Sequence, residues 1–125
     1  MIVLDTSALV AILKGEVEAG SFLQIIVDED RCLLSAVGLF EASMVMIGRG
    51  PAAAANDLDA LVRRRGIEVV PFDEEQARQS RAAFVRYGKG RHPAALNFGD
   101  CAAYALASRS GCRCCSRERI SQRRT

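Results

Sequence analysis

The sequence predicts an α/β fold with a central parallel sheet. Short apolar runs at residues 2–4, 32–34 and 67–70 alternate with longer segments in which apolar side chains recur at helical spacing. This alternation is typical of parallel strands that are joined by helices. Half of the 125 residues are apolar and only three are proline, so the chain can bury a core large enough for one compact domain.

The first predicted unit is a strand, a turn and a helix. Residues 2–4 are wholly apolar and predict a buried strand, and the polar residues Asp5, Thr6 and Ser7 can cap a helix that runs through Lys14. After a break between two glycines, helical spacing predicts a second helix from about residue 22 to the acidic residues 28–30. The apolar run 32–34 is then expected to form the second strand.

The remaining elements follow the same alternation. Ser35 can cap a long apolar helix that closes at the Gly-Arg-Gly-Pro sequence beginning at Gly48. Beyond it, residue spacing and turn residues predict, in order, a helix over 52–65, a strand over 67–70, a helix over 73–87, a loop over 88–93 and a helix over 97–107.

The net charge of +2 is unevenly distributed along the chain. From Arg109 onward there are six arginines and one acidic residue, Glu118, whereas the residues before Arg109 include 11 basic and 14 acidic side chains. The body of the protein therefore lacks a uniformly basic surface. Any contact with nucleic acid would come from local basic patches such as 63–65 and 86–92.

Several features predict a cytoplasmic protein without a membrane partner. No apolar run approaches the roughly 20 residues that span a bilayer. Asp5 lies where a signal peptide would have its apolar stretch. Cys32 and Cys101 lie in apolar segments, which is typical of reduced thiols in a core.

Three carboxylates, Asp5, Glu41 and Asp100, lie in segments that are otherwise almost wholly apolar. A buried carboxylate is costly unless its charge is compensated, and no lysine or arginine in these segments is placed to do so. Asp5 follows the first strand, where an open parallel sheet forms its ligand crevice, and the helices of Glu41 and Asp100 could flank the same edge. Since hard divalent cations bind carboxylate oxygens, the pattern favours a metal site.

Other interpretations of these residues stay open. Asp5 and Asp100 each lie where a helix N-cap is expected, and Glu41 could be an exposed glutamate. A catalytic triad is not favoured, because the only histidine, His92, has no aspartate beside it. The cysteines at 112, 114 and 115 lack the second pair and the histidines of a zinc site. An aspartyl-phosphate enzyme would need a lysine after a late strand, whereas the two lysines lie at 14 and 89.

Three segments resemble the PIN-domain family, and most closely its VapC-like toxin ribonucleases from type II toxin–antitoxin systems. Residues 1–9 (MIVLDTSAL) are similar to the family's first strand with its metal-binding aspartate. Residues 35–42 (SAVGLFEA) are similar to the helix whose glutamate points into the site, and residues 96–107 (LNFGDCAAYALA) are similar to the third acidic motif. The resemblance covers residues 1–111, which we expect to form the PIN-like nuclease domain.

The resemblance implies a PIN-like, Rossmann-like fold with three layers, α/β/α. It also implies an endoribonuclease that depends on Mg²⁺ or Mn²⁺, with Asp5, Glu41 and Asp100 as its catalytic residues and metal ligands. The implied partners are an RNA substrate of the tRNA or rRNA class, a cognate antitoxin protein and a second copy of the chain in a homodimer.

Five further residues are weaker candidates for contact with substrate. Thr6 and Ser7 could orient Asp5 or touch a phosphate. Arg86, Lys89 and Arg91 could contact phosphates near Asp100, and a solvated basic loop is the alternative interpretation.

Residues 112–125 form an atypical tail rich in arginine and cysteine. Where the family has a strand of the PLLFKG kind, residues 112–118 read CRCCSRE, which is too charged and too poor in β-branched residues for a buried parallel strand. We therefore predict that the last strand is missing or degraded. Codons for this segment, read from the third base of the first, can encode PLLFKG, so we hypothesise a frameshifted ending that the coding DNA would test.

The tail leaves two further questions open. Glu118 is only an accidental candidate for a fourth acidic ligand, and the arginines could instead form a disordered extension that attracts RNA. A domain without its last strand could keep the three carboxylates and bind metal, antitoxin or RNA without turnover. This catalytically impaired protein is the alternative to an active enzyme.

Overall fold

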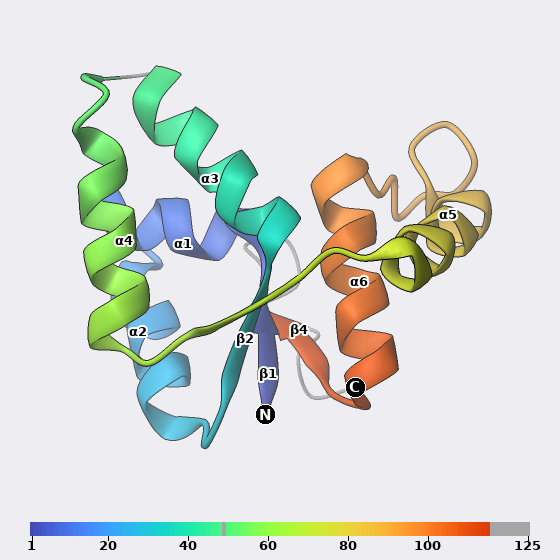
Figure 1. Cartoon of the computed structure of the whole chain (residues 1–125), viewed down its shortest axis with the longest axis horizontal. Helices are drawn as coiled ribbons and strands as arrows, with labels where there is room; N and C mark the ends of the chain where they lie inside the picture. The colour runs from blue at the N-terminus through green and yellow to red at the C-terminus, as the bar shows by residue number, and fades with distance from the viewer. Residues whose placement is uncertain (49, 116–125) are drawn as a thin grey trace.

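The computed structural model describes residues 1–48 and 50–115 and confirms the predicted α/β fold (Figure 1). The helices and strands of this part of the chain are β1 (Ile2–Leu4), α1 (Thr6–Leu13), α2 (Ala19–Asp28), β2 (Cys32–Ser35), α3 (Ala36–Gly48), α4 (Ala54–Arg64), β3 (Glu68–Val70), α5 (Glu74–Tyr87), α6 (Phe98–Ser110) and β4 (Arg113–Cys115). None of the helices within these ranges is both long enough and apolar enough to cross a membrane.

The sheet has four parallel strands in the order β3-β2-β1-β4. Ile2 pairs with Cys32 of β2 on one side and with Arg113 of β4 on the other. Because all the strands are parallel, their carboxyl ends meet at one edge of the sheet. The turn after β1 and the start of α3 therefore lie together at that edge, as Figure 1 shows.

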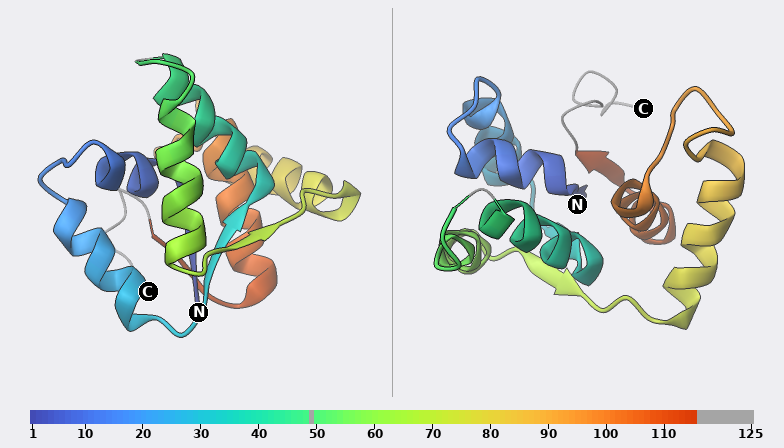
Figure 2. Two further views of the ribbon diagram at one scale, coloured as in Figure 1. Left: turned by 60° about the vertical axis from the view of Figure 1, so that its left-hand side comes forward. Right: turned by 90° about the horizontal axis from the view of Figure 1, so that it is seen from above.

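Alternate residues of β1 separate the core into two layers. Ile2 and Leu4 pack in a cluster that includes buried side chains of α1, α2 and α4, whereas Val3 packs against Ala103, Leu106 and Ala107 of α6. Helices thus cover both faces of the sheet, with α6 alone on its face and α5 packed outside α6 (Figure 2). The three-layer α/β/α arrangement that the resemblance implied is confirmed.

Polar side chains fix where the helices begin. Asp5 is the N-cap of α1, Asp73 is the N-cap of α5, and the Ser35 hydroxyl accepts a hydrogen bond from the backbone N–H of Val37 at the start of α3. At the other end of α6, Gly111 adopts a left-handed conformation with φ +68°, which ends the helix and turns the chain into β4.

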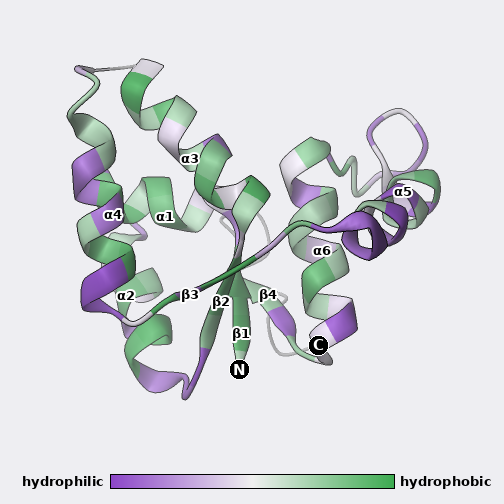
Figure 3. Cartoon of the chain, viewed as in Figure 1, coloured by the Kyte–Doolittle hydropathy of each residue, from purple (hydrophilic) through white to green (hydrophobic). Residues whose placement is uncertain are grey.

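The hydropathy of the elements matches their positions. Figure 3 shows hydrophobic β1 and β2 at the centre of the sheet and a largely hydrophilic α5 at the periphery. Only Gln76 and Ala83 of α5 are buried, and the helix contacts α6 rather than the sheet. The segment after α5 returns to α6 through a bridge between Gly88 and Leu96.

The last strand, which we predicted to be missing or degraded, is present as a short strand of three residues, so the prediction of a missing strand was wrong. Residues 113–115, within the segment expected to be a tail, form β4 and pair with β1. An edge strand tolerates polar residues: Arg113 forms an ion pair with Glu29, with Nη2 and Oε2 separated by 3.1 Å. Cys115 is fully buried in the cluster around Ile2 and Leu4, since a cysteine packs as a small apolar side chain. Glu118 and the arginines after residue 115 lie outside the described residues.

Candidate active site

A cleft opens at the carboxyl edge of the sheet, directly beyond the end of β1. Its volume is about 280 Å³, and α1, α3 and the start of α6 supply its walls. The residues that line it are Asp5, Thr6, Ser7, Val10, Lys14, Glu16, Glu41, Val45, Asn97 and Asp100. All three carboxylates that the sequence singled out therefore line the same cleft, although they are separated by up to 95 positions in the chain.

Asp5 is the most buried acidic residue of the cleft. It is 5% exposed, and its Oδ2 accepts hydrogen bonds from the Ser7 hydroxyl at 3.0 Å and from the Ser7 backbone N–H at 3.4 Å. Its own backbone N–H donates to the carbonyl oxygen of Cys115 at 2.9 Å. The end of β4 and the first turn of α1 thus hold this residue from two sides.

The pKa of Asp5 is raised from 3.8 to about 6. Burial is the main cause, because it disfavours the charged carboxylate. The neighbouring charge of Asp100 raises the pKa further and Glu41 adds a smaller effect, while the hydrogen bonds from Ser7 lower it. In the part of the chain that the structure describes, no cationic side chain is among the groups that lower the pKa of Asp5. A bound cation would supply the missing positive charge, so the cleft favours binding of a cation.

Glu41 and Asp100 meet where α3 approaches the first turn of α6. Gly99 is buried there, and a β-carbon at this position would lie 2.7 Å from Cδ of Glu41. Glycine at this position leaves room for the end of the Glu41 side chain beside the first turn of α6, so Glu41 and Asp100 line the same cleft. Each carboxyl group is half-buried.

Asp100 has a structural role as well as a place in the cleft. Its Oδ2 accepts a hydrogen bond from the backbone N–H of Asn97 at 3.0 Å, and its N–H donates to Oδ1 of Asn97 at 2.9 Å. These bonds form a capping box. The capping interpretation of Asp5 and Asp100 and their location in one acidic cleft are therefore both correct.

Thr6 and Ser7 differ in what their hydroxyl groups do. The buried Thr6 Oγ1 donates to the carbonyl oxygen of Gly38 at 3.3 Å, which ties α1 to α3. A β-carbon at Gly38 would lie 2.9 Å from Leu34 Cδ1 of β2 and 3.8 Å from Thr6 Oγ1, so the small residue leaves room for Leu34 beneath the start of α3. Ser7 instead contacts Asp5 directly, as described above, and is the hydroxyl group that orients it.

The cleft offers the donor atoms that suit a hard divalent cation. Within residues 1–48 and 50–115, no three His, Cys, Asp or Glu side chains are close enough together to ligate one ion as they stand. Carboxylates repel one another in the absence of a counter-charge, and the charges of Asp100 and Glu41 add to the effect of burial in raising the pKa of Asp5. Because the acidic groups supply only oxygen ligands, the chemistry of the set fits Mg²⁺ or Mn²⁺ rather than a softer metal.

The structure does not bring the three basic candidates to the cleft. Arg86 lines a separate groove between α5 and α6, and neither Lys89 nor Arg91 is among the residues that line the acidic cleft. Nε of Arg91 donates instead to the carbonyl oxygen of Val85 at 3.1 Å. The basic loop around residue 90 is exposed.

The sequence reasoning missed Lys14 and Asn97, which both line the cleft. A signal for Lys14 was present, since Thr6, Val10 and Lys14 are four residues apart and so share one face of α1. For Asn97 the signal was its position three residues before Asp100, which is the spacing of a reciprocal cap.

Comparisons with known proteins identify a family and several relatives. The family model described as the PIN domain matches residues 2–124. A ribonuclease VapC of Mycolicibacterium smegmatis is 41% identical over 109 residues, which cover 87% of this chain and 84% of the relative. Ribonuclease VapC28 of Mycobacterium tuberculosis is 40% identical over 106 residues, which cover 84% of this chain and 80% of the relative.

A solved structure also matches. The crystal structure of Mycobacterium tuberculosis VapC20, a sarcin-ricin loop cleaving toxin, superposes with a TM-score of 0.72 and covers 89% of this chain and 84% of that one. At 19% sequence identity, this likeness shows a shared fold.

Proposed function

This chain belongs to the PIN-domain family and is VapC-like, and on that premise we propose that it is a metal-dependent endoribonuclease, the toxin of a toxin–antitoxin pair. The observation that carries the proposal is the buried Asp5, with a pKa raised to about 6, in one cleft with Glu41 and Asp100. A ribonuclease of this kind hydrolyses phosphodiester bonds of RNA. We include a cytoplasmic location in the proposal.

The three carboxylates are proposed to hold Mg²⁺ or Mn²⁺. When bound, such an ion lowers the pKa of a coordinated water and stabilises charge on the departing oxygen of a phosphodiester. Ser7 orients Asp5 through its hydroxyl group, and the capping box fixes Asp100 on the first turn of α6. Glu41 is positioned by its contact with Gly99.

The remaining walls of the cleft are suited to an RNA backbone. Lys14 supplies a cationic group and Asn97 a polar group at the rim of the acidic cluster. The Thr6 hydroxyl is already engaged with Gly38, so we assign it the positioning of α1 against α3. We propose an RNA of the tRNA or rRNA class as the substrate, since a structured RNA can present a single-stranded loop to a cleft of this size.

Apolar residues beside the cleft support protein partners. Phe40, Met44 and Ile47 lie on one face of α3 and are 65%, 51% and 42% exposed, and Phe98 at the start of α6 is 74% exposed. Exposed apolar patches of this kind are typical of protein interfaces. We propose that they serve in a homodimer or in binding of a cognate antitoxin. Phe40→Ser should lower the mass of the particle in light scattering if the homodimer uses this face.

The function is tested by incubating the purified chain with a structured RNA and Mg²⁺. We expect cleavage that EDTA abolishes and Mn²⁺ restores, and loss of at least about a thousandfold in kcat for Asp5→Asn, Glu41→Gln or Asp100→Asn. Asp57→Asn removes one exposed acidic group of α4 outside the cleft and should leave cleavage unchanged. Titration calorimetry with Mn²⁺ provides a second measurement that does not depend on turnover.

A catalytically impaired protein is the alternative function. It would bind Mn²⁺ in calorimetry and leave RNA intact. An impaired protein was expected only if the last strand were lost. The strand β4 is present, however, and its Cys115 carbonyl oxygen accepts a hydrogen bond from the backbone N–H of Asp5. An active enzyme is therefore the better-supported proposal.

A further inference from the structure

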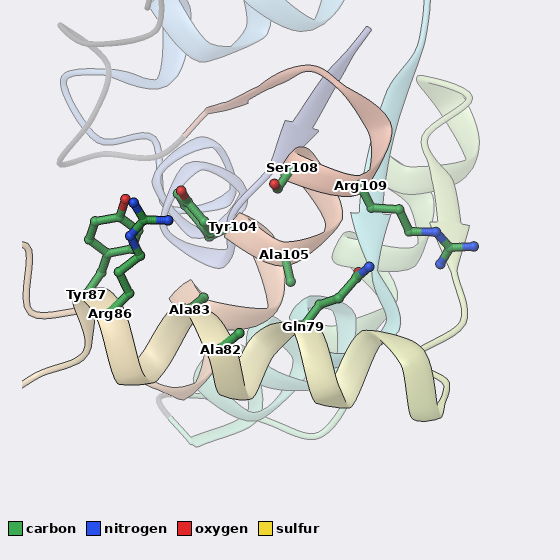
Figure 4. A pocket seen from close by; sticks show the side chains of 9 residues that line it. All are labelled: Gln79, Ala82, Ala83, Arg86, Tyr87, Tyr104, Ala105, Ser108 and Arg109. Atoms are coloured by element: carbon green, nitrogen blue, oxygen red, sulfur yellow. The ribbon is translucent and has the colours of Figure 1, made fainter.

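A second groove lies between α5 and α6, apart from the acidic cleft. Its volume is about 360 Å³, within the range of small-ligand sites in proteins. Three alanines form its floor, and Figure 4 shows Arg86, Tyr87 and Tyr104 at one end with Gln79 and Arg109 at the other. None of these residues lines the acidic cleft.

Aromatic and guanidinium groups gather at one end of this groove. The Tyr87 and Tyr104 ring centroids lie 5.3 Å apart at an interplanar angle of 57°. The guanidinium carbon of Arg86 lies 5.4 Å from the Tyr87 centroid, which places a cation over an aromatic face. Unpaired nucleic-acid bases stack on tyrosine rings and on arginine planes of this kind.

The groove is also positively charged. Neither Arg86 nor Arg109 forms an ion pair with a carboxylate among residues 1–48 and 50–115. Both residues are exposed, and Gln79 and Ser108 add neutral polar groups between them. Phosphates are the anions that these two arginines, one at each end of the groove, would favour.

Helix α6 connects this groove to the acidic cleft. Asp100 lies on its first turn in the cleft, Tyr104 lies four residues later and Ser108 eight residues later. At about 1.5 Å per residue, Tyr104 is roughly 6 Å farther along the helix than Asp100. An extended polymer that passes Asp100 can therefore continue into the groove.

We propose that the α5–α6 groove binds a short stretch of single-stranded RNA next to the nucleotides at the acidic cleft, with a base against the tyrosine rings at one end and backbone phosphates on Arg86 at that end and on Arg109 at the other. This inference rests on the proposed ribonuclease function and adds a second contact to it. The continuity along α6 favours RNA over an acidic peptide, since the proposed ribonuclease function places a substrate strand at Asp100.

The sequence supplies an internal probe for this groove. The chain has no tryptophan and two tyrosines, and both tyrosines line the groove. The intrinsic tyrosine emission of the full protein therefore reports on the groove without any label.

The test compares three proteins with EDTA present, so that RNA binds without cleavage. They are the wild type, the double variant Arg86→Ala/Arg109→Ala, and the control Arg78→Ala/Arg81→Ala, which removes two exposed charges of α5 outside both cavities. We expect a single-stranded hexaribonucleotide to quench tyrosine emission in the wild type and the control, and to bind at least about tenfold more weakly to the groove variant. The slope of log affinity against log salt should fall by about 1.4, or roughly 0.7 for each lost phosphate contact on a single strand.

Steady-state cleavage with Mg²⁺ gives a second readout. We expect the groove variant to raise KM about tenfold and to leave kcat within about twofold, because the groove does not touch the reacting phosphate. Equal KM values for the groove variant and the control would overturn the proposal. A complete lack of cleavage by the wild type would instead contradict the proposed function, and the binding data would still decide on the groove.

Two other ligands test alternative occupants of the groove. A mononucleotide that quenches tyrosine emission as tightly as the hexaribonucleotide would identify a site for free nucleotides rather than a track for the strand. An acidic hexapeptide that quenches emission where the RNA does not would identify a protein-docking site. Either result would overturn the proposal.

Discussion

The α-carbon of Gly99 lies so close to the carboxyl group of Glu41 that a β-carbon at position 99 would be 2.7 Å from Cδ of Glu41. This contact joins α3 to α6 at the acidic cleft. The atoms that a β-carbon would meet all belong to the end of the Glu41 side chain, so a larger residue at position 99 would push the Glu41 carboxyl group out of its place in the cleft.

Gly99→Ala should therefore displace Glu41 and reduce RNA cleavage. We expect kcat to fall by at least about tenfold because the Glu41 carboxyl group is displaced, with little loss of stability because the end of that side chain can rotate away. Cleavage kinetics and thermal unfolding measure the two effects. Gly20→Ala is the matched control, because no atom lies within 4 Å of a β-carbon built at that exposed position of α2. Equal activity of the two variants would contradict the proposed role of this contact.

The raised pKa of Asp5 predicts a pH dependence of stability in the metal-free protein. Because the folded-state pKa is about 6 and the unfolded-state value is 3.8, the folded state binds more protons between these values, and the free energy of unfolding falls as the pH rises from about 4 to about 6. The full shift corresponds to a loss on the order of 3 kcal/mol above pH 6.

Asp5→Asn isolates this effect. Asparagine keeps the N-cap of α1 and removes the charge, so the variant should gain stability relative to the wild type as the pH rises from 5 to 7 in EDTA. Chemical unfolding at each pH measures the difference. A constant difference between the two proteins across this range would show that Asp5 does not titrate there.

The strand β4 predicts a stability contribution from residues 113–115. A chain that ends at Gly111 loses the buried Cys115 side chain and the hydrogen bond from Asp5 N–H to the Cys115 carbonyl. We expect it to be at least about 2 kcal/mol less stable than a chain that ends at Cys115, by chemical unfolding. Arg113→Ala should cost only about 1 kcal/mol or less, because its ion pair with Glu29 is partly exposed.

We propose that residues from about 112 onward are a frameshifted ending, and the strand offers a test of this idea. A version whose ending is restored to the other frame places PLLFKG at the position of β4. Its larger apolar side chains should bury more area against β1 and raise the midpoint of thermal unfolding. Coding DNA that cannot give this second reading, or a restored chain that unfolds earlier, would reject the hypothesis.

Lys14 predicts an effect on RNA binding rather than on chemistry. It lines the acidic cleft at the end of α1, so Lys14→Met should raise KM about fivefold and keep kcat nearly constant. The slope of log affinity against log salt should fall by roughly 0.7, the value for one lost phosphate contact on a single strand. Lys89→Met removes the other lysine, which lies outside the cleft, and should change KM less. A larger rise in KM for Lys89→Met than for Lys14→Met would instead place the substrate on the loop after α5.

The sequence predicted the order of elements because local patterns specify them. The apolar run before Asp5, the cap at Ser35 and the glycine at 48 each act on their neighbours in the chain. The three carboxylates were also visible in sequence, since acidic residues are unusual in such apolar segments. Local patterns gave the wrong result at β4, where burial of Cys115 and pairing with β1 outweigh the poor strand propensity of the segment.

The sequence by itself determined the fold class, the family and the three acidic residues of the candidate site. Only the tertiary structure decided that Lys14 lines the acidic cleft, that Arg86 lines another groove and that Gly99 contacts Glu41. The physical reason is that these relationships depend on how α1, α3, α5 and α6 cross one another. A crossing is set by packing between residues far apart in the chain, which no local periodicity specifies.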